Sequence, residues 1–76
     1  MKIYIKEYDT ILETDDIVAA VPFCEDSRAK VLVTTKTPIF IAGGDPTCYI
    51  AIVTTSSTRA CDIVENISEI MGAKKI

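Results

Sequence analysis

The sequence predicts an α+β fold, an antiparallel β-meander of about five strands with one C-terminal helix packed on one face. Residues up to position 54 fall into short segments rich in Ile, Val, Thr and Tyr, which favour strands. Beyond that point the apolar residues recur at spacings of three and four, as in an amphipathic helix. A chain of 76 residues is long enough for one domain, so residues 1–76 are expected to form a single domain.

The first expected strand covers residues 2–6, where Ile3 and Ile5 alternate with lysine and tyrosine. This period of two is typical of a half-buried strand. Residues 7–10 are expected to form a turn, and residues 11–13 a short second strand.

Residues 14–16 (Thr-Asp-Asp) resemble a capping cluster in front of the apolar run 17–21. One interpretation is a short helix that Pro22 stops. The other is a single turn that leads into a strand reaching Phe23. Because Ile, Val and Phe favour strands, we prefer the turn followed by a strand, and the helix remains an alternative.

The middle of the chain is expected to contain a loop at residues 25–27 and three strands, at residues 29–35, 39–42 and 47–54. Thr37-Pro38 separates the first of these strands from the second. Gly43-Gly44-Asp45-Pro46 is a strong turn signal, since glycine supplies positive φ and proline fixes φ. The second and third of these strands are therefore expected to form a hairpin.

The predicted helix runs from about Thr58 to Met71, after a Thr/Ser cluster at residues 55–58 that can cap it. Its apolar stripe consists of Ala60, Ile63, Val64, Ile67, Ile70 and Met71. Gly72 is suited to the position after the last helical residue, and Lys74 and Lys75 follow the negative end of the helix dipole. Arg59 belongs to the polar face.

Charge disfavours nucleic acid as a partner. The chain has 11 acidic and 8 basic residues, a net charge of −3, and its bases are scattered. Phosphate binding needs clustered Lys and Arg, so nucleic-acid binding is possible but not favoured.

A membrane is not an expected partner, since no apolar run approaches the roughly 20 residues of a spanning helix. Lys2 is followed by an alternating segment unlike a signal peptide, and we expect a cytoplasmic protein.

The cysteines predict neither disulfides nor a metal site. Cys24, Cys48 and Cys61 are odd in number and lack paired spacing, and the chain has no histidine. We expect three buried thiols, with Cys61 packed beside Ala60. Without histidine, Cys48 also lacks the usual base for a nucleophile, so we expect no cofactor, no metal and no enzymatic activity.

The hydrophobic content predicts a binding partner. Hydrophobic residues make up 49% of a chain whose core must be thin. Apolar surface that remains exposed usually marks an interface, so we expect a homo-oligomer or a bound protein partner. The helix should cover one face of the sheet, and the other face is where we expect the function.

The candidate interaction residues are Tyr4, Lys6, Tyr8, Asp15, Asp16 and Arg59. With Lys2, the first three would form an aromatic and basic stripe on one strand face, which could stack bases or bind protein. Asp15 and Asp16 could be part of a carboxylate pair for acid–base work, but capping of a turn or helix is preferred.

The stretch from Ile11 to Val21, I-x-x-x-D-D-I-V-A-A-V, resembles the early segment of FlbD-like proteins, which are short bacterial proteins linked to flagellar and swarming motility. Residues 49–53 and 62–67 resemble their last strand and helix, and residues 36–48 would be an insertion. This resemblance implies a few strands with a C-terminal helix.

Residues 3–5, 16–19 and 51–54 are also similar to RemA/RemB-type regulators of biofilm genes. That resemblance implies an oligomer that binds DNA through arginines. Because Arg28 and Arg59 are the only arginines in this acidic chain, no DNA site is carried over.

Taken together, these features favour a small non-enzymatic regulatory or adaptor protein that acts by protein–protein contact as an oligomer. A nucleic-acid-binding regulator is the first alternative. A phage-type inhibitor, which would use its acidic charge to occupy a basic site on a host protein, is the second.

Overall fold

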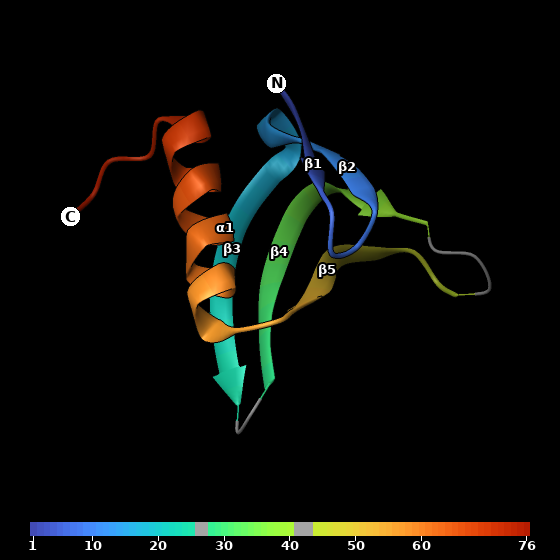
Figure 1. Cartoon of the computed structure of the whole chain (residues 1–76). Helices are drawn as coiled ribbons and strands as arrows, with labels where there is room; N and C mark the ends of the chain where they lie inside the picture. Colours follow the sequence, from blue (N-terminus) through green and yellow to red (C-terminus); the bar gives the residue numbers. More distant parts are fainter. Residues whose placement is uncertain (26–27, 41–43) are drawn as a thin grey trace.

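The computed structural model describes residues 1–25, 28–40 and 44–76 and has the predicted α+β architecture (Figure 1). Its elements are β1 (Lys2–Ile5), β2 (Thr10–Glu13), the 3-10 turn η1 (Thr14–Asp16), β3 (Ile17–Glu25), β4 (Arg28–Ile39), β5 (Thr47–Thr54) and α1 (Ser57–Met71). All paired strands are antiparallel, and they form two sheets, the β1–β2 hairpin and the sheet β3–β4–β5. The expected antiparallel strands with one C-terminal helix are confirmed, but the five strands of the described residues do not form one continuous sheet.

The core lies on one face of the three-stranded sheet. Along β4, Val31 and Val33 are fully buried, and on β5 Ile50 and Ile52 are buried in the same way. Because side chains alternate across a strand, these residues share one face, which we call the inner face. In Figure 1 both α1 and the β1–β2 hairpin lie in front of the sheet. Their buried side chains join the inner face in one cluster, to which they contribute Ile5, Leu12, Ala60, Ile63 and Ile67.

The segment that begins at residue 14 adopts the preferred conformation, and the helical alternative is wrong. A single 3-10 turn at Thr14–Asp16 leads into β3, which pairs with β4 along most of its length. The strand is longer than expected and ends at Glu25. Pro22 does not end this strand, because β3 lies at the edge of the sheet. The edge that points away from β4 has no partner strand and needs no N–H donor.

The break expected before residue 39 is wrong, since β4 continues through Thr37 and Pro38 to Ile39. Residues 41–42 of the strand expected at 39–42 lie outside the described residues. The β4–β5 ladder shifts register between Thr34 and Ile39 and then resumes with Ile39 opposite Thr47. The expected hairpin therefore forms between β4 and β5. In the expected turn, residues 44–46 are not part of a strand, and residues 41–43 lie outside the described residues. Residues 26–27 of the expected loop also lie outside them.

The predicted helix is confirmed, with a start one residue earlier than expected. Ser56 is its N-cap, and the Ser56 Oγ atom accepts a hydrogen bond from the Arg59 N–H at 3.1 Å. At the other end, Gly72 adopts φ 70°, and its N–H donates to the Glu69 carbonyl at 3.1 Å. Glycine adopts this left-handed conformation without steric cost, so it ends the helix.

The expectation of buried thiols is wrong, because Cys24, Cys48 and Cys61 are all exposed. Cys24 lies near the end of the edge strand β3 and Cys48 at the start of β5. Cys61 follows Ala60 on α1 and falls outside the buried stripe of the helix. The thiols therefore do not supply packing to the core.

The assignment of β5 side chains to two faces predicts a large contrast between neighbours. Ile52→Ala should lower the free energy of unfolding by about 2–5 kcal/mol, because it leaves a cavity in the core. The control Val53→Ala should change it by less than about 0.5 kcal/mol, since this side chain is exposed. Urea unfolding followed by circular dichroism measures both values, and equal losses would contradict the assignment.

Candidate interaction surface

The face of the three-stranded sheet opposite the core carries most of the large exposed apolar side chains of the sheet. Three cross-strand rows make up this face, which we call the outer face: Ala19–Thr34–Tyr49, Val21–Leu32–Ala51 and Phe23–Lys30–Val53. The exposed fractions are 49% for Val21, 48% for Phe23, 36% for Leu32, 53% for Tyr49 and 65% for Val53. A contiguous apolar patch of this kind is typical of an interaction site.

The described elements that flank the sheet leave this face open. Both α1 and the β1–β2 hairpin pack against the inner face, where their buried residues join the core. The alternation of side chains then points the outer rows away from both elements. Strands with apolar side chains on both faces usually belong to sheets that are covered on both sides, so the outer face is suited to a partner.

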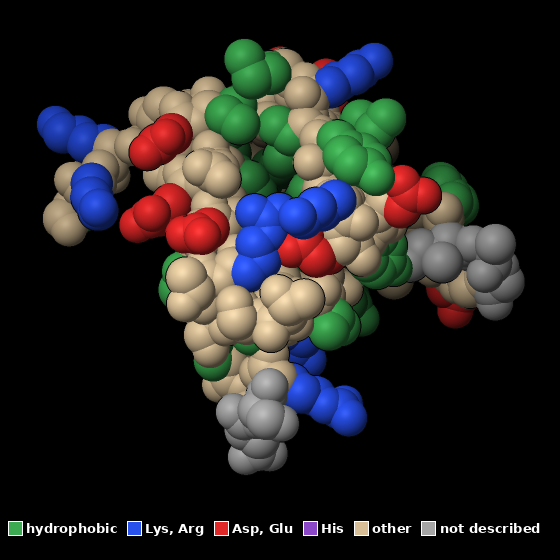
Figure 2. Space-filling model, viewed as in Figure 1, with side chains coloured by type: hydrophobic (Ala, Val, Ile, Leu, Met, Phe, Trp, Pro, Cys, Tyr) green, Lys and Arg blue, Asp and Glu red, His purple; other side chains and the backbone are tan. Residues whose placement is uncertain are grey.

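Charge is distributed unequally between the two sides of the sheet. Eight acidic residues belong to the hairpin, η1 or α1: Glu7, Asp9, Glu13, Asp15, Asp16, Asp62, Glu65 and Glu69. Figure 2, which views the molecule from the side of α1, shows several acidic side chains on its surface. Lys30 is the charged residue in the three outer rows, and its Nζ lies 5.3 Å from the centroid of the Phe23 ring, within cation–π range. Beyond that row Glu25 and Arg28 face each other across the β3–β4 ladder.

The predicted stripe of Tyr4, Lys6 and Tyr8 does not form one strand face. β1 ends at Ile5, and Lys6 and Tyr8 lie in the turn that joins it to β2. Asp9 takes a left-handed φ of 48° in this turn, which reverses the chain before the alternation can continue. All three predicted residues are exposed, but they belong to different local structures.

Tyr4 instead makes a contact within the hairpin. Its hydroxyl donates a hydrogen bond to Asp9 Oδ1 at 2.8 Å, and this bond raises the pKa of Tyr4. The ring also lines a groove of about 350 Å³ between β1 and α1, together with Ile3, Arg59, Ile63, Asn66, Ile67, Glu69 and Ile70. The groove brings two predicted residues, Tyr4 and Arg59, to one place.

Asp15 and Asp16 lie in different surroundings. Asp15 is exposed, whereas Asp16 Oδ1 accepts hydrogen bonds from the backbone N–H and the hydroxyl of Thr37, at 3.2 Å and 2.9 Å. Asp16 thus holds the irregular part of β4 in place. Capping by Thr14 is also wrong, since its buried hydroxyl donates to the Met1 carbonyl at 2.9 Å.

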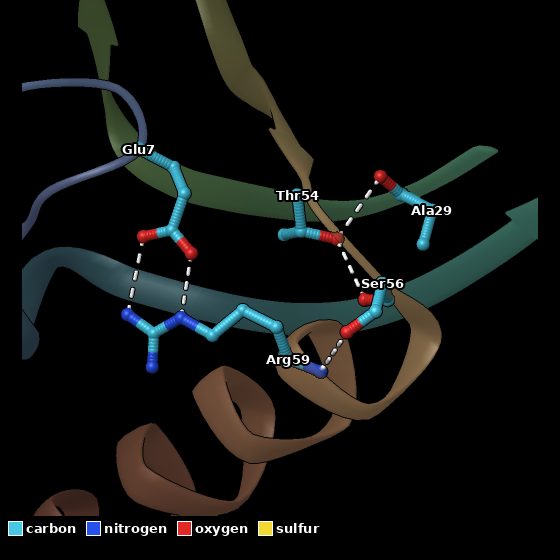
Figure 3. Close-up of polar contacts among 5 residues, drawn as sticks. All are labelled: Glu7, Ala29, Thr54, Ser56 and Arg59. Atoms are coloured by element: carbon cyan, nitrogen blue, oxygen red, sulfur yellow. Dashed lines mark hydrogen bonds and ion pairs between the residues drawn. The ribbon is translucent and has the colours of Figure 1, made fainter.

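Arg59 forms a bidentate ion pair with Glu7, a contact that the sequence does not predict. Its Nε lies 2.5 Å from Glu7 Oε2, and its Nη2 lies 3.1 Å from Oε1 (Figure 3). The side chains are 31% and 10% exposed, so the pair is partly shielded from water. The hydrogen bonds to Arg59 hold the pKa of Glu7 below its usual value, and the pKa of Arg59 is raised. The Nε and Nη2 atoms of Arg59 therefore join α1 to the hairpin turn through hydrogen bonds to Glu7.

The connection from β5 to α1 lies beside this ion pair. Thr54 Oγ1 lies within hydrogen-bonding distance of the Ala29 carbonyl, at 3.1 Å, and of the Ser56 carbonyl, at 2.9 Å (Figure 3). Ser56 then caps the helix on which Arg59 lies. These contacts fix the start of α1 relative to the sheet, which places Arg59 within reach of Glu7.

Comparisons with family models, with curated proteins and with solved structures found no match. Within residues 1–25, 28–40 and 44–76, no three His, Cys, Asp or Glu side chains are grouped as a metal ion would need. No helix in that part of the chain is both long and apolar enough to cross a membrane.

The Glu7–Arg59 ion pair predicts a pH-dependent stability. Because the pKa of Glu7 is lowered in the folded state, its contribution is present above the usual value of 4.5 and is lost as the pH falls through the folded pKa. Glu7→Gln should therefore lower the free energy of unfolding by about 1 kcal/mol at neutral pH, after allowance for solvent screening of Arg59. The difference from the wild type should shrink as the pH falls below 4.5 and through the lowered pKa of Glu7.

Urea unfolding at a series of pH values measures this difference. Glu65→Gln on the exposed side of α1 is the matched control, and it should leave the pH profile close to that of the wild type. A loss in Glu7→Gln that is the same at every pH would contradict the assigned role of the ion pair.

Proposed function

We propose that this chain is a small non-enzymatic regulatory or adaptor protein that binds another protein through the outer face. The observation that carries the proposal is the set of five large apolar side chains, each 36–65% exposed, on the side of the sheet away from α1. Complete burial of a fully exposed side chain of this size contributes about 1.5–3 kcal/mol, so covering side chains that are 36–65% exposed contributes roughly half of that for each one.

The composition of the outer face supports a partner with an apolar surface and an acidic rim. Its centre, the row Val21–Leu32–Ala51, is wholly apolar. Lys30 and Arg28 lie toward one end and can pair with carboxylates of the partner, although Glu25 offsets part of this charge. Apolar contact in the centre with charges at the edge is the usual anatomy of protein interfaces.

The chemistry of the outer face favours binding over catalysis. Its polar side chains are those of Lys30, Thr34 and Tyr49, spread over an open sheet. Such a surface does not enclose a substrate or exclude water, as catalytic sites do. Residues 11–21 resemble FlbD-like proteins, which are linked to flagellar and swarming motility, and a binding role agrees with that resemblance.

Nucleic-acid binding by the same face is the second candidate. Phe23 and Tyr49 are exposed there, and Lys30 lies over the Phe23 ring. Aromatic side chains and a cation on an open sheet are the elements of a base-stacking platform. The net charge of −3 and the small number of bases on this face make the protein partner the better supported candidate.

The test places a charge in the centre of the outer face. Leu32→Glu should leave the fold intact, because the side chain is partly exposed, and should weaken binding to the partner at least 10-fold. Thr58→Glu, which adds the same charge at an exposed position of α1, is the matched control and should bind like the wild type. The partner is captured on immobilised wild type, identified by mass spectrometry and titrated with each purified variant.

Equal binding by the wild type and Leu32→Glu would contradict the proposed surface. Single-stranded DNA or RNA that binds the wild type at low salt, and that Leu32→Glu does not bind, would favour the second candidate instead.

A further inference from the structure

The two edges of the three-stranded sheet differ in how well they are protected. The edge strand β3 has Pro22 near its middle and an irregular register between Ile17 and Ala19. Both features hinder the addition of another strand. The opposite edge strand, β5, has the sequence T-C-Y-I-A-I-V-T, with no charge, proline or glycine. Charged residues and proline are among the devices by which proteins protect an edge, and β5 contains neither.

The edge of β5 that points away from β4 also has no backbone partner among the described residues. In the sheet order β5 has β4 as its neighbour on one side and no strand on the other. The backbone hydrogen bonds of the described turns, loops and caps involve no residue of β5. At its start, Thr47 Oγ1 donates to the Tyr49 carbonyl at 3.0 Å. The rest of this edge presents N–H and C=O groups that another strand can pair with.

We propose that two copies of this chain pair antiparallel through their β5 strands and form a continuous six-stranded sheet. A second copy fits this edge because the strand is complementary to itself. In a two-fold register with Ala51 opposite Ala51, Tyr49 lies opposite Val53 and Ile50 lies opposite Ile52. Residues that face each other in an antiparallel pair lie on the same face, so the outer and inner faces both continue across the joint.

Side chains at the joint support this pairing over one with an unrelated strand. Tyr49 and Val53 are 53% and 65% exposed in a single chain, and an aromatic side chain opposite a β-branched one is a favourable cross-strand pair. No charge on β5 opposes the approach of a second β5, although each chain has a net charge of −3. The pairing would also double the width of the outer face. It goes beyond the proposed function, since it uses the edge of the sheet and not its face.

The first test is the mass in solution. Light scattering coupled to size exclusion should give twice the 8.3 kDa of one chain for the wild type. Ala51→Pro should shift this equilibrium towards the monomer, because proline disrupts strand pairing at the centre of the edge. Circular dichroism checks that this variant still folds. A wild type that stays monomeric at millimolar concentration overturns the proposal.

The second test locates the joint and does not depend on the folding of the proline variant. The natural cysteines are replaced (Cys24→Ser, Cys48→Ser and Cys61→Ser), and a single cysteine is introduced by Tyr49→Cys, Ala51→Cys or Val53→Cys. Mild oxidation should link two chains through at least one of these positions, and the position reports the register. Val21→Cys, on the same face but on β3, is the matched control and should link at least 10-fold more slowly.

Cross-links through Val21→Cys that match or exceed those through β5 overturn the edge-to-edge arrangement, because they place the faces of two sheets against each other. The Leu32→Glu variant separates this proposal from the proposed function. It should remain a dimer while it loses the partner, whereas a failure of pairing alone would leave partner binding by the monomer intact.

Discussion

The alternation of side chains along the central strand β4 governs the rest of the structure. Val31 and Val33 point to the core, so Lys30 and Leu32 must point away from it. Because β4 pairs with a neighbour on each side, its register also decides which side chains of β3 and β5 are buried. Within the described part of the chain, one helix and one hairpin can cover this sheet, and both pack on the inner face. The apolar outer face follows from that geometry.

Polar contacts stabilise the packing of α1 and the hairpin on the inner face of the sheet. The Glu7–Arg59 ion pair joins the hairpin turn to the first turn of α1, and Ser56 caps the helix just before Arg59. Asp16 holds the irregular part of β4 through Thr37. These polar contacts lie beside the core. Most acidic residues therefore lie on α1, the hairpin or η1, and the centre of the opposite face is left apolar, which is the basis of the proposed binding function.

Features determined by local spacing could be predicted from the sequence, and features determined by long-range pairing could not. The stripe and caps of α1 are visible because a helix repeats every 3.6 residues. The break expected at Thr37-Pro38 does not occur, because the ladder to β5 resumes at Ile39. The stripe through Tyr4 and Lys6 is absent, since the chain reverses directly after β1. No local pattern relates Glu7 to Arg59, which are 52 residues apart. The sequence predicts the outer face only as the side of the sheet that the helix does not cover. Its residues can be identified only when the pairing register of the strands is known.

The central claim is that α1 and the hairpin cover one face of the sheet and leave an apolar face open to a partner. Methyl NMR spectra recorded with a soluble paramagnetic agent test it most directly, because the agent broadens signals of methyl groups that solvent reaches. Strong broadening is expected at Val21, Leu32 and Val53, and sharp signals are expected at Val31, Val33 and Ile52. Equal protection of both sets in the protein without a partner would show that the outer face is covered, and would contradict the account.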